Sequence, residues 1–463
     1  MTSSATKTVL VLLASLLTGC ERVVEPLAPP GGSWTARPSM RATLIVPSST
    51  LTSREKLDFW TGMGFFRDPW VSAPASTTAR DGLGPLFNSQ SCIGCHNGGG
   101  RGRSLLMNPN SVSTILKLGY GDNVINSAHP EYGPQLQTRA TYPHVDNRRA
   151  TGGYYYGEGV PQVHHETHAL ELPDGSAVSM NRMHVAIEGN DDPLVVTSAR
   201  IAPSLIGLGL LEAIPEDALV AIADENDVDG DGISGRIHWR GQGEHRAAGR
   251  FGWKATHPTV ATQTSAAFAE DIGISNPIQR RQNCAEPQID CRGQRTGNDP
   301  KEGVEITQPI FERVVFFAAH IAPPPAAAIS AKIADGRDLF ADAGCDGCHT
   351  PSHQVDVVDA DGLTHQERIW PYTDLLVHDM GAGLADALPE GNVSGSEWRT
   401  PPLWGLGKSL LINDETGLLH DGRAATISEA IAWHGGEASS SKETYMEFSA
   451  EERAALEAFV LAL

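Results

Sequence analysis

Apolar residues recur at helical spacing in a few short stretches of this chain, and long irregular segments rich in Gly and Pro separate them. The spacing predicts helices over residues 54–66 and 259–271. A further helix begins at Thr307 with Pro309 in its first turn, and the three prolines at 323–325 stop it. That proline run is the clearest domain boundary in the sequence.

The C-terminal part repeats the helical pattern with clear start signals. A helix ends near Phe340, and a capping box at 426–429 begins a short helix that ends at Gly435. A second capping box at 449–452 begins the last helix, whose apolar residues lie on one face. We expect this face to pack on the helix that ends near Phe340. Between about 115 and 201, apolar and polar residues instead alternate over short runs, which indicates short strands and loops.

Two C-x-x-C-H motifs carry the strongest chemical signal. In this motif two thiols form thioether bonds to one haem, and the adjacent His becomes the fifth ligand of the iron. A redox dithiol or half of a zinc site is the alternative, but both pairs have the trailing His and neither has a second C-x-x-C nearby. The motifs predict two covalently bound haem c groups, held by Cys92, Cys95 and His96 and by Cys345, Cys348 and His349.

These patterns together predict a mainly α fold with short strands and long loops. Two cytochrome c-like haem domains flank an irregular α+β middle region, and a chain of 463 residues is long enough for several domains. The expected divisions are a lipoprotein signal peptide (1–20), a flexible tether (21–46), an N-terminal c-type haem domain (47–200), an intervening region (201–325) and a C-terminal cytochrome c domain (326–463).

The N-terminus predicts export. Lys7 precedes an apolar run at 9–17 that is too short to span a bilayer, and Leu17-Thr18-Gly19-Cys20 resembles a bacterial lipobox. Cleavage before Cys20 and lipidation of its thiol follow from that reading; in the alternative, Cys20 is discarded with an ordinary signal peptide. We expect a protein that faces the periplasm and touches a bacterial membrane, inner or outer, only through its lipid anchor.

The charge narrows the range of partners. A net charge of −21 argues against nucleic acid and anionic membrane surfaces. It is compatible with steering a basic partner, such as a small electron-carrier protein of the cytochrome c or cupredoxin type, although acidity can also serve solubility alone. The basic loop at 97–103 offers Arg101 and Arg103 to haem propionates, or simply to solvent.

Two further features predict structural sites in the middle of the chain. Cys284 and Cys291 lie close together in an exported chain and are expected to form a disulfide, with free thiols as the alternative. A calcium ion is expected at Asp227, Asp229 and Asp231, which are spaced as in the first half of an EF-hand loop. The bidentate Glu at position twelve is absent, because His238 stands there; an acidic surface turn is the alternative.

The sixth ligands of the irons stay open on position alone. For the second haem the candidates are His434, Met380, His378 and His420, and a thioether raises the reduction potential where an imidazole lowers it. For the first haem the candidates are four histidines of the middle region: His164, His165, His168 and His184. An open distal side is the alternative.

The residues also resemble a known group. The two haem motifs, with His-Asp-Gly-Arg at 420–423 and the helix that follows, resemble bacterial di-haem cytochrome c peroxidases. The closer resemblance is to the di-haem oxidoreductases, also described as peroxidases and formerly as thiol oxidoreductases. It covers nearly everything from about residue 51 onward and rests on Gly82 to Gly102, Tyr132 to Gln137, Ile206 to Pro215, Asp227 to Gly235, Gly249 to Ala255, Trp398 to Gly405, Leu419 to Arg423 and Trp433 to Ala438.

The resemblance implies a ligand set. In the peroxidases a Met near the end of the helix after His-Asp-Gly binds the high-potential haem, and a Tyr takes that place in a relative that makes a quinone cofactor. His434 occupies it here, which favours His349 and His434 as the ligands of the second iron and puts a high-potential role in doubt. The family's calcium ion between domains agrees with the loop at 227–231, whereas thiol chemistry is not expected because every Cys has another use.

The first functional hypothesis is therefore a peroxidase that reduces hydrogen peroxide with electrons from a donor protein. Cleavage of the peroxide requires a base and a group that stabilises the departing oxygen. The candidates are Gln135, Glu166, Arg200 and Glu212, with Trp253 as an electron relay. The alternative is a non-catalytic electron-transfer cytochrome of a respiratory or metal-reduction chain, and a third reading is a peroxide-driven oxidase with a radical site such as Trp253.

Overall fold

The computed structural model describes residues 25–38, 43–121, 128–144, 148–358 and 362–463. The predicted signal peptide and the lipidation site at Cys20 lie outside these residues. No helix in the described part of the chain combines the length and the apolar character needed to cross a membrane.

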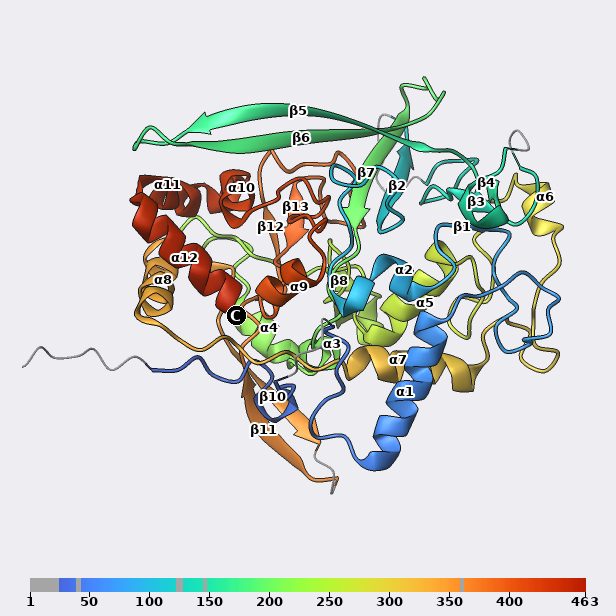
Figure 1. The fold of residues 1–463 in the computed structure, drawn as a ribbon, viewed down its shortest axis with the longest axis horizontal. Coiled ribbons are helices and arrows are strands. Elements are labelled where there is room, and N and C mark those ends of the chain that lie inside the picture. Colours follow the sequence, from blue (N-terminus) through green and yellow to red (C-terminus); the bar gives the residue numbers. More distant parts are fainter. Residues whose placement is uncertain (1–24, 39–42, 122–127, 145–147, 359–361) are drawn as a thin grey trace, which may run out of the picture.

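The N-terminal haem motif lies beside a pair of helices that are far apart in sequence. Helix α1 (Ser53–Arg67), which starts with a capping box at Thr52, packs against α7 (Gln308–Ala319) (Figure 1). The helices touch at Gly62, where an added Cβ would lie 2.1 Å from the carbonyl oxygen of Arg313. Only a residue without a side chain permits this approach.

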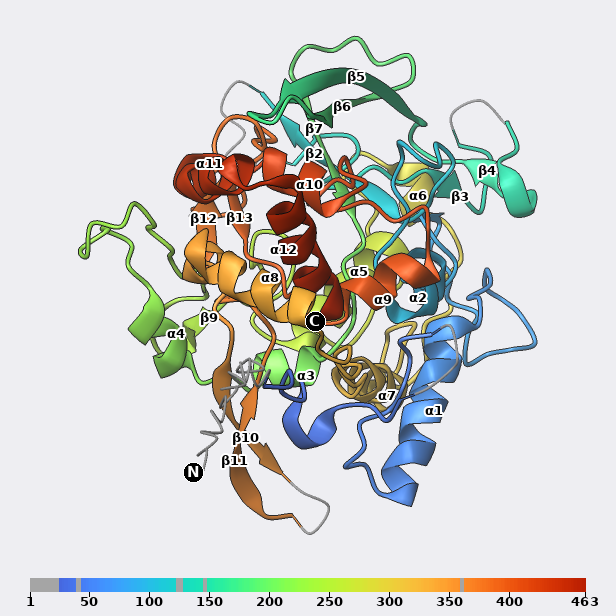
Figure 2. The same ribbon diagram turned by 60° about the vertical axis from the view of Figure 1, so that its left-hand side comes forward.

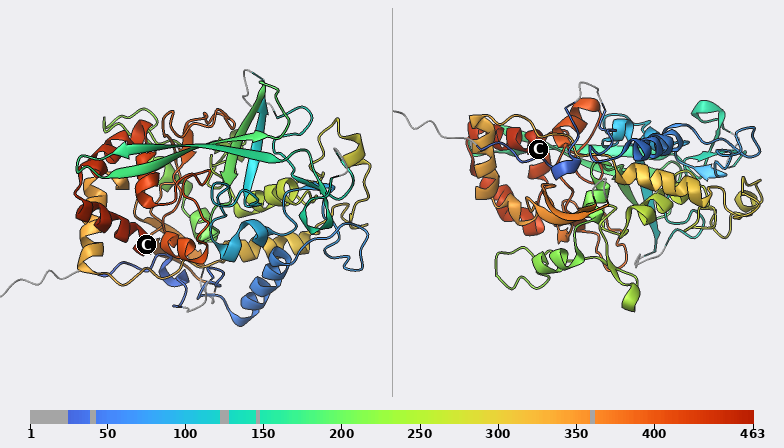
Figure 3. Two further views of the ribbon diagram at one scale, coloured as in Figure 1. Left: turned by 45° about the horizontal axis from the view of Figure 1, so that its top comes forward. Right: turned by 90° about the horizontal axis from the view of Figure 1, so that it is seen from below.

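A second helix pair supports the C-terminal motif in the same way. Helix α8 (Ala331–Asp342) packs against α12 (Ala450–Ala462), as the apolar face of the last helix predicted. Here Gly336 makes the close contact, since an added Cβ would lie 1.9 Å from the carbonyl oxygen of Ala455. The α8–α12 pair lies at one end of the longest axis and the α1–α7 pair lies well apart from it in the other half (Figure 3), so each haem motif has its own helical support.

The other helices are short and connect or cover these pairs. They are α2 (Cys92–Cys95), α3 (Leu208–Glu212), α4 (Glu216–Ile222), α5 (Val260–Asp271), α6 (Ile289–Arg292), α9 (Leu406–Ile412), α10 (Ile427–Ala432) and α11 (Ser439–Glu447). The helices predicted over 54–66 and 259–271 are thus confirmed as α1 and α5, and Thr259 caps α5 by accepting a hydrogen bond from the Thr262 amide.

Antiparallel strands form six small sheets in the described residues. One has three strands, β1 (Leu86–Phe87), β3 (Arg139–Ala140) and β4 (Tyr155–Tyr156). The others are pairs: β2 (Thr114–Tyr120) with β7 (Val195–Ile201), β5 (Pro161–Glu171) with β6 (Ala177–Ile187), β8 (Trp239–Arg240) with β9 (Ala247–Ala248), β10 (His353–Val358) with β11 (Thr364–Ile369), and β12 (Val377–Asp379) with β13 (Glu397–Arg399).

The prediction of a mainly α fold was wrong. Helix accounts for 29% of the structure and strand for 19%, so neither class dominates. The long β5–β6 hairpin lies across α10 and α11 (Figure 1), and the β10–β11 hairpin projects from the other side of the molecule (Figure 2). Most of β5 is exposed, so its apolar alternation is weak, and β10 lies outside the region of about 115–201 in which strands were predicted.

Described residues of the segment expected to be a flexible tether pair with distant parts of the chain. The Pro30 carbonyl accepts a hydrogen bond from the Trp370 amide, and the Ala36 amide donates to the Pro323 carbonyl. Leu44 and Ile45 are buried in two of the apolar cores. Backbone pairing to distant segments, rather than local periodicity, orders these residues, and their sequence gave no sign of it.

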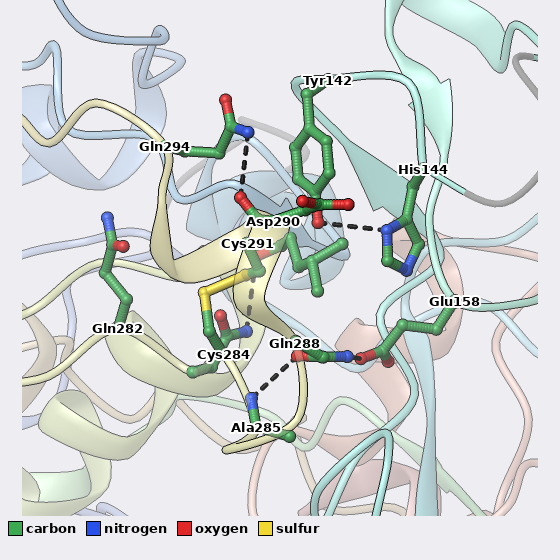
Figure 4. Close-up of a disulfide and its surroundings, with 12 residues drawn as sticks. Tyr142, His144, Glu158, Gln282, Cys284, Ala285, Gln288, Asp290, Cys291 and Gln294 are labelled. Carbon is green, nitrogen blue, oxygen red and sulfur yellow. Dashed lines mark hydrogen bonds between the residues drawn. A yellow bond between two sulfur atoms is a disulfide. The ribbon is translucent and has the colours of Figure 1, made fainter.

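A disulfide joins Cys284 to Cys291 with a Cα–Cα distance of 5.7 Å (Figure 4). The loop it closes is short, so the loop-entropy relation assigns it only about 2 kcal/mol of stabilisation. Gln288 in the same loop donates a hydrogen bond of 2.5 Å to Glu158 Oε1, and the Gln137 amide donates one of 2.6 Å to Glu158 Oε2. Burial nevertheless raises the pKa of Glu158 to about 8 from its ordinary 4.5.

The Glu158→Gln variant is expected to flatten the pH dependence of stability. The folded state binds the Glu158 proton more tightly than the unfolded chain, so its contribution is complete below about pH 4.5 and is lost as the pH rises to about 8. Urea unfolding at pH 5 and pH 8 measures the difference, which should be on the order of a few kcal/mol smaller in the variant. Glu286→Gln, an exposed position in the same loop, is the matched control and should retain the wild-type slope.

Candidate functional site

The first C-x-x-C-H motif opens into a large cavity. Helix α2 supplies Cys92 and Cys95, and His96 follows it; all three line a cavity of about 480 Å³. Strands β2 and β7, helices α5 and α7 and the 388–391 loop are among the segments that contribute the other walls. Phe66 of α1 lies 6.3 Å from the His96 ring, centroid to centroid, so the first helix pair fixes the position of this histidine.

The second motif lines a smaller and more apolar cavity of about 180 Å³. Cys345, in a 3-10 turn (Cys345–Gly347), reaches it together with Cys348 and His349. Phe340 of α8 lies 6.2 Å from the His349 ring, which repeats the arrangement at the first motif. His434, which follows α10, lines the same cavity.

The three expected iron ligands share one hydrogen-bonding pattern. Nδ1 of His96 bonds the Pro203 carbonyl at 2.8 Å, Nδ1 of His349 bonds the Tyr372 carbonyl at 3.1 Å, and Nδ1 of His434 bonds the Ala430 carbonyl at 2.8 Å. Because a carbonyl only accepts, the proton lies on Nδ1 and Nε2 keeps its lone pair, as a metal-binding histidine requires. Burial lowers the pKa of His96 and of His349 to about 4, so both rings are neutral.

The motif cysteines agree with haem attachment and not with redox chemistry. All four are free of disulfides, and burial raises the pKa of Cys92 and of Cys345 to about 12. A redox dithiol needs a thiol that ionises near neutral pH, which these do not. Thiols paired beside a neutral His on the wall of a cavity are the residues that a covalently bound haem needs, so both sites fit the group.

The other candidates for the sixth ligand of the second iron are His378, His420 and Met380, and they differ in whether a ligand atom is free to bind a metal. Both ring nitrogens of His378 face carboxylates at 2.8 Å, Asp374 through Nε2 and Glu437 through Nδ1. Although burial opposes the charge, these carboxylates raise its pKa well above the ordinary value, and a protonated ring has no lone pair for a metal. His420 stacks on Trp398 at 3.7 Å, while Met380 lines the cavity without such a contact.

Polar groups on the wall of the first cavity come from distant segments. Gln135 and Arg200, both predicted from the sequence, lie there. Gln135 Nε2 donates to Asp271 Oδ1 at 2.8 Å, while its Oε1 is buried and has no partner among the described residues. Arg200 forms ion pairs with Asp386 and Glu390, each at 2.7 Å.

Sequence reasoning missed several residues of this wall. Lys117 of β2 pairs with Glu270 at 2.5 Å, and Glu390 completes the charged set. His257 also lines the cavity; its ring makes no hydrogen bond within the described chain, and burial lowers its pKa to about 4. No local motif marks these residues, because only the packing of β2, α5 and the 388–391 loop brings them together.

Two predicted catalytic residues lie elsewhere. Glu166 is on the exposed β5 strand, where its side chain is 70% exposed and one carboxylate oxygen lies 3.6 Å from Nε2 of His168. Glu212 accepts a hydrogen bond of 2.6 Å from the Val260 amide at the start of α5 and lines neither cavity. The first therefore belongs to a surface hairpin and the second caps a helix. The histidines at 164, 165, 168 and 184 share the β5–β6 hairpin and also lie outside the first cavity.

Trp253 lies between the two cavities and lines both. Its indole Nε1 donates a hydrogen bond of 2.8 Å to the Ile201 carbonyl, and it packs with Trp398 and Trp433 in one apolar core. The indole therefore lies between the two cavities, and its predicted role as an electron relay stays a prediction.

The acidic loop predicted to bind calcium lies on the surface. One carboxylate oxygen from each of Asp227, Asp229 and Asp231 lies within 4.8 Å of the others. His238, at position twelve, faces away, since its Nδ1 bonds the Lys254 carbonyl at 2.6 Å. The end of the loop is held by Glu437, which accepts hydrogen bonds from the amide and hydroxyl of Ser234.

The chain belongs to the di-haem oxidoreductase family. The family model described as Di-haem oxidoreductase, putative peroxidase, matches residues 166–463. This match confirms the resemblance, an oxidoreductase function and haem as the cofactor. Neither the curated proteins nor the solved structures gave a match.

Proposed function

We propose that this protein is a peroxidase that reduces hydrogen peroxide in the first cavity with electrons that arrive through the second. The contrast between the cavities carries the proposal. The second cavity offers two histidines, His349 and His434, each held through Nδ1 by a backbone carbonyl so that Nε2 keeps its lone pair. The larger first cavity has one histidine held in this way, His96, and a wall of charged and amide groups.

Haem c, attached through the motif cysteines, supplies peroxide binding and one-electron transfer when bound. The residues of the first cavity then position the substrate. The unpartnered Gln135 Oε1 accepts a hydrogen bond from the peroxide O–H, which orients it. The ammonium of Lys117 and the guanidinium of Arg200 place positive charge beside the departing oxygen.

Electrons are proposed to come from a small carrier protein of the cytochrome c or cupredoxin type and to cross between the cavities near Trp253. The position of that indole on both cavity walls supports this route. The net charge of −21 supports a basic carrier, whose association would weaken as salt is added.

Gln135→Leu tests the role of the first cavity. Without the Oε1 acceptor, kcat/KM for hydrogen peroxide should fall about 10- to 100-fold, while the absorption spectrum of both haems is retained. Gln137→Leu is the control, because Gln137 lies two residues further along the chain and is buried, yet does not line the cavity. Equal losses in both variants would remove Gln135 from the mechanism.

A non-catalytic electron-transfer cytochrome is the second candidate, and His257 is the observation that favours it. This neutral histidine lines the first cavity with an unbonded ring, so it is available as a sixth ligand. With both irons six-coordinate, peroxide would have no open position. His257→Ala separates the two: in a peroxidase it leaves iron coordination unchanged, and in a pure electron carrier it converts one low-spin haem to high spin.

We also propose that the protein is exported and lipid-anchored, and that it binds a calcium ion. The lipobox ending at Cys20 supports export and a lipid anchor on a bacterial membrane facing the periplasm, where haem c is attached. The convergent carboxylates of Asp227, Asp229 and Asp231 support a calcium ion, and Ser234 links that loop to Glu437 beside the second cavity.

A further inference from the structure

Six arginines are almost fully buried in the described part of the chain, and they fall into two classes. Three of them form ion pairs with an aspartate: Arg200, Arg423 and Arg453. The other three donate only to backbone carbonyls and have no carboxylate within 4 Å among the described residues: Arg101, Arg250 and Arg399. A buried charge without an opposite charge is strongly unfavourable, so the second class needs an explanation.

Two of these unpaired arginines meet at one place. Arg101 and Arg399 both line the second cavity and a small adjoining cavity of about 70 Å³. Arg101 donates through Nε and Nη2 to the carbonyls of Gly417 and Leu419. Arg399 donates through Nε and Nη1 to those of Gly252 and Thr400. Nη1 of Arg101 and Nη2 of Arg399 have no acceptor within the described residues.

The two guanidinium groups also act on each other. Burial lowers the pKa of Arg101 to about 10, and repulsion by Arg399 adds to the effect. Burial likewise lowers the pKa of Arg399 to about 10. Two cations that share a buried wall, each with a terminal nitrogen unused, form a site for an anion that accepts hydrogen bonds from both.

We propose that Arg101 and Arg399 bind a carboxylate of the second haem, one of its propionates, and that this charge pair raises the reduction potential of that haem. The proposal rests on haem occupancy of the second cavity, not on peroxide as the substrate. A propionate is the carboxylate that arrives there with the cofactor. Its negative charge, left unneutralised, would stabilise the oxidised iron, so the arginines offset part of the loss of potential that imidazole ligation by His434 causes.

Redox titration followed by optical absorption tests the proposal. In Arg101→Gln the midpoint potential of the second haem should fall, so that its ratio of reduced to oxidised form at a fixed potential drops about tenfold, which is about 59 mV for a one-electron couple. Arg399→Gln should shift the same haem in the same direction. Arg101→Lys keeps the charge and should restore most of the wild-type potential.

Arg103→Gln is the matched control. Arg103 is two residues away, but its side chain is 44% exposed and pairs with Glu415, so both potentials should stay unchanged. If Arg101→Gln fails to yield holoprotein, Arg399→Gln and Arg101→Lys decide the question. Unchanged potentials would overturn the proposal, as would a shift confined to the first haem. A wild-type potential that varies with added acetate would assign the site to a free anion instead.

Discussion

A Cys92→Ala, Cys95→Ala double variant is expected to carry one haem per chain and to lose peroxide turnover. Both thiols lie on the wall of the first cavity, and without thioether bonds the haem is held there only by His96 and by packing. Haem absorbance per chain should fall by half, and peroxide consumption should fall to the rate of a protein-free control. Alkaline pyridine spectra measure the first quantity and a peroxide electrode the second.

The equivalent double substitution at the second motif is the control. Cys345→Ala with Cys348→Ala should remove the second haem while the first still changes its spectrum on addition of peroxide, because the open cavity is intact. Turnover with an electron donor should nevertheless be lost, since the route for electrons is broken. If the protein without the first haem still reduced peroxide at the wild-type rate, the assignment of the two cavities would be reversed.

His434→Met is expected to raise the midpoint potential of the second haem by an amount on the order of 0.1 V or more, because a thioether stabilises reduced iron relative to imidazole. Nδ1 of His434 is fixed by the Ala430 carbonyl at 2.8 Å, and the residue lines the cavity that holds His349. Redox titration gives the potential, and near-infrared absorption identifies the ligand change.

His353→Gln is a matched control for that substitution. His353 is buried and bonds the Thr373 carbonyl at 2.7 Å, but it lies outside the cavity, so its loss should leave the potential unchanged. A His434→Met protein with the wild-type potential and ligand spectrum would show that another side chain, with Met380 or His420 as the remaining candidates, binds the second iron.

The sequence predicted the local features of this molecule well. The haem motifs, the capping box before α12 and the apolar face that packs on α8 are each contained in a few consecutive residues. The strand content was underestimated because exposed strands such as β5 lack apolar alternation. Within the segment predicted to be a tether, Pro30 and Ala36 pair with Trp370 and Pro323, and pairing between segments so far apart in sequence leaves no local signal.

The residues of the candidate site also fall into those that a local motif marks and those that only the fold brings together. The spacing of the C-x-x-C-H motif was enough to predict Cys92, Cys345 and the other motif residues. No local pattern marks Lys117, His257 or Glu390, which come together only in the folded chain. Glu166 and Glu212 show the converse. Their residue type suits acid–base chemistry, but Glu166 lies on an exposed surface strand and Glu212 accepts a hydrogen bond at the start of a helix.

Electron paramagnetic resonance of the purified protein tests the central claim most directly, because it counts the coordination states of the two irons. We expect one high-spin and one low-spin haem per chain, with only the high-spin signal altered by stoichiometric hydrogen peroxide. Two low-spin signals in every redox state, with no response to peroxide, would contradict the peroxidase and leave an electron carrier.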